Sequence, residues 1–181
     1  MGKKLTEMSL EELWQLFPII LTEHKDEWPA RFEEEKEILI SLLPKNVAIH
    51  HIGSTAIKGI WAKPIIDILI EVPNENDLVT VKDKLVSNGY ICMHQEEKRI
   101  SLNKGYTENG FAEKVFHIHL RTAGDNAEIR FRDLLNSDEK LAKQYEKLKL
   151  DLWKKYEHDR DGYTNAKTEF IEKCNKSAEN G

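Results

Sequence analysis

Asp67, His117 and His119 are the side chains of this sequence best suited to metal binding or acid–base chemistry. Asp67 lies inside an Ile-rich run, where burying an ionised carboxylate without a partner is costly. Such a carboxylate indicates a strand end near solvent, a metal ion or a cation. His117 and His119 alternate with apolar residues, so on a β-strand both imidazoles point to one face. They could bind a metal ion there, or they could be half-buried side chains that hydrogen-bond to their neighbours.

A turn suited to anions precedes Asp67. The β-rich segment 46–52 ends at Gly53, where the backbone can bend sharply and come close to a ligand. Ser54 and Thr55 follow, and their hydroxyl and backbone N–H groups could form an anion-binding turn. His51, immediately before the glycine, could orient a phosphate or another ligand.

Basic side chains that could neutralise a phosphate lie on both sides of this stretch. Lys63 precedes the Asp67 strand, and Arg132, Lys149 and Lys167 belong to the C-terminal helical part. Arginine can grip a phosphate or carboxylate with two hydrogen bonds, and lysine acts as a point charge. The alternative is that these residues are ordinary solvated helix side chains, with Arg132 paired to Asp133 or Glu128.

The elements that must position these residues are a sheet followed by helices. Alternating and apolar runs predict strands at 46–52, 90–93, 99–103 and 114–121, and a further strand that carries Asp67 in the run opened by Pro64. Helical spacing predicts helices near 9–17, 29–43, 77–88 and 127–135, a helix capped by Asn136-Ser137, and a last helix after Asp159. The layout is α+β. We expect one domain over residues 1–181, with its sheet core at 46–121 and its C-terminal helices at 127–175.

Several local features accompany these elements. Ser9 opens a capping box, and 19–21 could form a brief strand. The glutamates of segment 33–37 are expected to be mostly solvated. We expect Val86 to point inward and Cys92 to be a small core residue, a loop holding Gly105 and Gly110 to join two paired strands, and the tail after Cys174 to fray.

Composition narrows the class of protein. The chain has 181 residues, of which 40% are hydrophobic and 33% charged, as in ordinary globular proteins. Its net charge of −5 argues against non-specific binding to nucleic acid. Two widely spaced cysteines without a signal peptide predict a reducing, cytoplasmic setting. No apolar run reaches membrane-spanning length.

The central stretch resembles the signature of the polymerase-beta-like nucleotidyltransferase superfamily, in which a Gly-Ser turn is followed by a strand bearing carboxylates. Here twelve residues separate Gly53-Ser54 from Asp67. The longer segment 51–68, HIGSTAIKGIWAKPIIDI, is similar to the GrpB-like family of predicted nucleotidyltransferases. The likeness continues through FHIHL (116–120), FRDLL (131–135), Tyr145 with Lys149, and YTNAK (163–167).

This resemblance implies the nucleotidyltransferase fold, a mixed sheet with flanking helices and a C-terminal helical part, with the His117–His119 strand beside the Asp67 strand. It also implies roles for Lys63, Arg132, Lys149 and Lys167, whose counterparts recur with the family's motifs. One position departs from the superfamily pattern, because Leu69 stands where a second carboxylate belongs. A hydrocarbon side chain cannot hold a hard cation, so a standard two-metal site is not expected.

The resulting hypothesis is metal-dependent transfer of a nucleoside monophosphate from a triphosphate to an unidentified acceptor. The catalytic residues would be Ser54, Asp67, His117 and His119, and the last three would hold a divalent metal (Mg, Mn or Zn). The substrate, a nucleotide or another phosphorylated small molecule, would be bound by Gly53, Ser54, Thr55, Lys63, Arg132, Lys149 and Lys167. The alternatives are a non-catalytic nucleotide- or metal-binding accessory protein, linked to coenzyme A metabolism by the family's fusion to dephospho-CoA kinase, and a metal-dependent phosphohydrolase.

Overall fold

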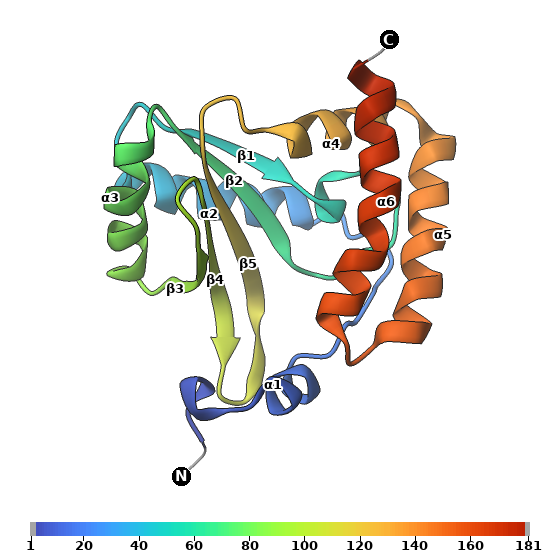
Figure 1. The fold of residues 1–181 in the computed structure, drawn as a ribbon, viewed down its shortest axis with the longest axis horizontal. Helices are drawn as coiled ribbons and strands as arrows, with labels where there is room; N and C mark the ends of the chain where they lie inside the picture. Colours follow the sequence, from blue (N-terminus) through green and yellow to red (C-terminus); the bar gives the residue numbers. More distant parts are fainter. Residues whose placement is uncertain (1–2, 180–181) are drawn as a thin grey trace.

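The computed structural model describes residues 3–179, which form a mixed sheet flanked by helices (Figure 1). In chain order the elements are η1 (Leu5–Glu7), α1 (Leu10–Leu16), α2 (Trp28–Leu42), β1 (Ala48–Ile52), η2 (Ser54–Ala56), β2 (Ile66–Val72), α3 (Glu75–Val86), β3 (Ile91–Gln95), β4 (Arg99–Thr107), β5 (Gly110–Thr122), α4 (Ala127–Ser137), α5 (Glu139–Tyr156) and α6 (Arg160–Glu179). This architecture confirms the predicted α+β class. No helix in the described range is long and apolar enough to cross a bilayer.

The order of the five strands places the chemically interesting side chains on one face of the sheet. The order is β1-β2-β5-β4-β3, and β2 and β5 are parallel neighbours at its centre. Asp67 is paired with His117, and Leu69 with His119. Because side chains alternate along a strand, all four point to the same face. The neighbouring placement of these two strands, implied by the resemblance, is thus confirmed.

The helices form two groups around the sheet, and the C-terminal helices α4, α5 and α6 stand together beside it, near the end of β1 (Figure 1). α2 and α3 pack on one face, where Ile66, Ile68 and Ile70 of β2 belong to the main hydrophobic core. The C-terminal helices α4, α5 and α6 form a second apolar cluster with the chain around η2. Asp67 points away from α2 and α3 and toward the residues of α6.

The hairpin between β4 and β5 is longer than the sequence pattern predicts. Instead of a loop holding Gly105 and Gly110, a turn at 108–109 joins the two strands. Gly105 lies inside β4 with φ +90°, and a Cβ added there would be 2.3 Å from the carbonyl oxygen of Lys114. The glycine therefore marks a close approach of two backbones within the ladder rather than a loop.

Two expectations about buried side chains are wrong. Cys92 is exposed because β3 is the edge strand and all its side chains face solvent. Val86 is 44% exposed at the last turn of α3. Cys174 is buried in the second cluster, and α6 continues beyond it to Glu179.

Two expectations near the N-terminus have different outcomes. The Ser9 capping box is present at the start of α1, as predicted. Residues 19–21 do not form a strand; an isolated bridge joins Thr22 to Ala62 instead. Ile19 and Leu21 are buried against Tyr163 of α6, so this segment ties the N-terminal part to the last helix.

The residue that caps α5 is not the predicted one, and the predicted residue Asn136 instead holds the chain that follows Gly53. Asp138 caps the helix by accepting a hydrogen bond from the backbone N–H of Leu141, rather than Asn136 or Ser137. Asn136 instead binds the chain around η2, donating to the carbonyl of Ala56 and accepting from the N–H of Lys58, both at 2.9 Å. The end of α4 therefore fixes η2 in place.

Candidate functional site

The two histidines of β5 converge on one oxygen of Asp67. Asp67 Oδ1 lies 3.1 Å from His119 Nε2 and 3.4 Å from His117 Nδ1. The side chains are 26%, 27% and 18% exposed, respectively, so solvent reaches the group. Burial alone would raise the pKa of Asp67, but the hydrogen bonds from His117 and His119 outweigh it and hold this pKa well below its usual value. The ionised carboxylate cannot donate, so each imidazole presents an N–H toward it.

Tyr106 and Arg160 extend this group, and sequence reasoning missed both. The Tyr106 hydroxyl lies 2.7 Å from His117 Nε2 and accepts a hydrogen bond of 2.6 Å from Arg160 Nη2. Burial lowers the pKa of His117 to about 4 despite the neighbouring Asp67 carboxylate. His117 is therefore neutral near pH 7, with its proton on Nδ1 facing Asp67 and its Nε2 accepting from Tyr106.

The other oxygen of Asp67 faces the glycine of the turn. Gly53 has φ +73°, and a Cβ added there would be 2.5 Å from Asp67 Oδ2. Only glycine combines this left-handed conformation with so close an approach. The Thr55 hydroxyl lies 2.9 Å from His51 Nε2, and the Ser54 hydroxyl is hydrogen-bonded to Tyr145. The turn is thus brought onto Asp67, while its two hydroxyl groups have partners within the protein.

His51 lies on the opposite face of the sheet from Asp67. Its ring stacks on Phe32 of α2 with centroids 4.8 Å apart, and burial lowers its pKa to about 4. His50, by contrast, shares a face with Glu71, whose carboxylate lies 3.0 Å from its Nε2. The strand register thus directs His51 away from the Asp67 face, contrary to the expectation that it orients a ligand.

Three basic side chains, Lys63, Arg160 and Lys167, surround the Asp67 group, and we call them the basic cluster. Lys63 Nζ and Lys167 Nζ lie 5.4 and 4.5 Å from the ring centroid of Tyr163. Burial, with repulsion from Lys167 and Arg160, holds the pKa of Lys63 well below its usual value. Burial also lowers the pKa of Lys167 to about 8, although Asp67 opposes the shift. Three basic groups thus lie around one carboxylate, and burial disfavours the charged form of both lysines.

Lys149 and Arg132, the other two proposed substrate ligands, make contacts within the protein. Lys149 is 1% exposed and its Nζ donates to the carbonyl oxygen of Trp61. Arg132 donates to the carbonyl oxygen of His51 at 2.8 Å and to Asp133 at 2.7 Å. These bonds join α4 and α5 to the chain on either side of η2.

Lys149 should make the protein's stability depend on pH. Burial and repulsion from Lys167 lower its pKa to about 7, while Glu146 opposes the shift. Between pH 7 and the usual lysine pKa the unfolded chain binds a proton that the folded chain does not, so stability rises with pH by up to about 1.4 kcal/mol per unit. Lys149→Met should reduce this rise between pH 7.5 and 9.5 in urea unfolding, and the remaining rise comes from Lys63 and Lys167, whose pKa values are also lowered. Lys147→Met, at a side chain 79% exposed, should leave it unchanged.

The residues proposed as metal ligands do not fit a metal ion as they are arranged. Asp67 Oδ1 already accepts a hydrogen bond from His119, and Oδ2 faces Gly53. His117 Nε2 is hydrogen-bonded to the hydroxyl of Tyr106. Between residues 3 and 179, no group of three or more His, Cys, Asp or Glu side chains is placed to hold a metal. Leu69, which replaces the second carboxylate, is fully buried. The adjacent basic cluster also repels a dication, so no step below depends on Mg, Mn or Zn.

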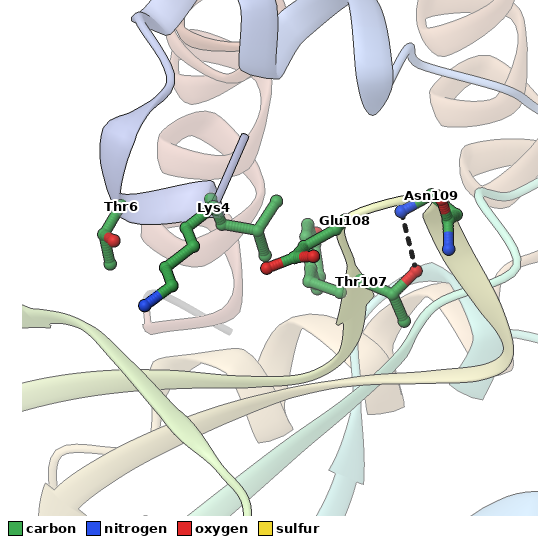
Figure 2. A pocket seen from close by; sticks show the side chains of 7 residues that line it. Lys4, Thr6, Thr107, Glu108 and Asn109 are labelled. Atoms are coloured by element: carbon green, nitrogen blue, oxygen red, sulfur yellow. Dashed lines mark hydrogen bonds between the residues drawn. The ribbon is translucent and has the colours of Figure 1, made fainter. Parts of the chain in front are cut away.

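An open pocket lies between η1 and the turn at 108–109, on the side of Tyr106 that faces away from Asp67 (Figure 2). Its volume is about 560 Å³, and its lining includes Lys4, Thr6 and Glu108. Tyr106 lines this pocket and also contacts His117 through its hydroxyl. The tyrosine therefore stands between the pocket and the Asp67 group.

A family model and individual protein sequences both match this chain to the same family. The family model described as GrpB protein matches residues 18–177. The glutamate-rich protein GrpB of Alkalihalophilus pseudofirmus is 36% identical over 161 residues, which span 85% of this chain and 92% of that protein. The UPF0157 protein YqkA of Bacillus subtilis is 33% identical over 159 residues; these span 86% of this chain but 46% of YqkA.

Comparison with solved structures gives the same architecture. The crystal structure of the conserved protein GrpB from Enterococcus faecalis matches with a TM-score of 0.75 and 29% identity, covering 88% of this chain and 96% of that one. The Cid1 poly(U) polymerase with MgGTP bound matches with a TM-score of 0.52 and 15% identity, covering 81% of this chain and 47% of Cid1. At that identity the second likeness shows the fold alone, and the fold is that of nucleotidyltransferases.

Proposed function

The chain belongs to the GrpB family, and from that premise we propose that it binds the phosphate groups of a nucleotide at the basic cluster beside Asp67, without a metal ion. The main supporting observation is that three half-buried basic side chains lie around a single carboxylate. Lys63, Arg160 and Lys167 come from two separate parts of the chain and face one carboxylate. A polyphosphate would supply the missing negative charge and would raise the depressed pKa values of both lysines.

The fold favours a nucleotide over other phosphorylated ligands. Cid1, a nucleotidyltransferase-fold protein, is described with GTP bound together with Mg. In this chain the position of the second carboxylate is Leu69, and the histidines of β5 hydrogen-bond to Asp67. These differences support nucleotide binding by an accessory protein over metal-dependent transfer or hydrolysis, both of which need an exposed set of oxygen or nitrogen ligands.

The proposal is tested by calorimetric titration of ATP and inorganic tripolyphosphate in buffer containing EDTA. Both should bind, and Lys167→Gln should weaken both about tenfold because it removes a charge-assisted contact to phosphate. Lys147→Gln, at an exposed position of α5 next to Asp151, is the matched control and should bind both ligands like the original protein.

Two results would contradict the proposal. Absence of binding under all conditions would remove it. Binding that requires added Mg, Mn or Zn, or release of pyrophosphate from ATP once such a metal is present, would favour the transferase hypothesis and its metal site at Asp67, His117 and His119.

A further inference from the structure

A small cavity next to Lys63 is not used by the site described so far. It lies between the segment before Thr22, the chain that leads into β2, and the start of β5. Its volume is about 220 Å³, and Pro18, Pro64, Phe111 and Val115 belong to its largely apolar wall. Pockets that take a whole small-molecule ligand are usually about 300–1,000 Å³, so this cavity suits one part of a ligand.

The cavity adjoins the basic cluster and the Asp67 group. Lys63 lines the cavity and is a member of the basic cluster. Val115 is two residues before His117 on β5, about 7 Å along the strand. Phe111 packs on Tyr106 with ring centroids 5.2 Å apart, and the Tyr106 hydroxyl contacts His117. A ligand with phosphates at Lys63 could therefore extend into the cavity.

The chemistry of the wall indicates which part of a nucleotide would enter. The rings of Phe111, Pro18 and Pro64 belong to this wall, and such apolar rings suit a flat aromatic group. A ribose presents several hydroxyl groups, and burying them against such a wall without partners is costly. We propose that the cavity holds the nucleobase of a nucleotide whose phosphates lie in the basic cluster, which rests on the function proposed above. The wall offers few polar groups for base edges, so bases are not strongly distinguished.

Filling the cavity tests this assignment. Ala112 lines the cavity at an exposed position of β5, where an aromatic residue is compatible with a strand. ATP should bind the original protein about tenfold more tightly than tripolyphosphate, and Ala112→Trp should remove this advantage while changing tripolyphosphate binding by less than about twofold. GTP and UTP should bind within about threefold of ATP.

The controls separate the possible failures. Ala48→Trp, at an exposed position of β1, should bind both ligands like the original protein. Ala112→Phe, with an unchanged unfolding midpoint, replaces the tryptophan variant if the latter fails to fold. Equal affinity of the original protein for ATP and tripolyphosphate, or equal effects of the substitution on both, would overturn the cavity assignment alone. Failure of both ligands to bind the original protein would instead overturn the proposed function.

Discussion

Replacing Asp67 with asparagine should destabilise the ligand-free protein by about 3 kcal/mol and should strengthen the binding of tripolyphosphate by about tenfold. The destabilisation follows because the carboxylate that faces His117, His119 and the basic cluster is lost. Removing one member of a partly buried charged group leaves its partners without compensation. The gain in affinity follows because the same carboxylate repels an incoming anion.

This expectation is the opposite of what a metal-dependent site would give. If Asp67 held a divalent metal that in turn held the phosphates, the Asp67→Asn protein would lose phosphate binding. Urea unfolding in phosphate-free buffer measures the first effect, and calorimetric titration in EDTA measures the second. Asp151→Asn, which removes the carboxylate of an exposed pair with Lys147, is the control and should change either quantity little.

The architecture could be predicted from the sequence because its signals are local. The alternation of Ile66, Ile68 and Ile70 with Asp67 identified both the strand and its two faces, and the structure follows that pattern. The failures occurred where burial depends on distant elements. Cys92 looked like a core residue, but strand order puts β3 at the sheet edge.

The site could be predicted only in part for the same reason. The motif positions around Asp67, His117 and His119 were recognisable, and the parallel pairing of β2 and β5 brings them together. Arg160 and Tyr106 gave no signal, because one begins α6 after a charged stretch and the other lay in a segment expected to be a loop. Their contact with His117 arises only when α6 packs over the hairpin.

The glutamates of segment 33–37 show that residue type alone does not predict which side chains are buried. They were expected to be mostly solvated, but Glu35 is only 3% exposed. Its carboxylate accepts hydrogen bonds of 2.8 and 2.9 Å from Lys104 Nζ on β4 and another from the hydroxyl of Tyr90. Helical periodicity places position 35 near Phe32 and Leu39 on the buried stripe of α2, so the face was predictable even though the partners were not.

Glu35→Ala should therefore destabilise the protein by about 3 kcal/mol, because it leaves the buried Tyr90 hydroxyl and the Lys104 ammonium group without their partner. Glu37→Ala, at an exposed position of the same helix, should change stability by less than about 0.5 kcal/mol in the same urea titration. The double change Glu35→Leu with Lys104→Met should recover the part of the loss that comes from the unpaired ammonium group, and adding Tyr90→Phe should recover the part that comes from the unpaired hydroxyl. A Glu35→Ala protein as stable as the Glu37→Ala protein would mean that the Glu35 group contributes nothing to holding α2 on the sheet.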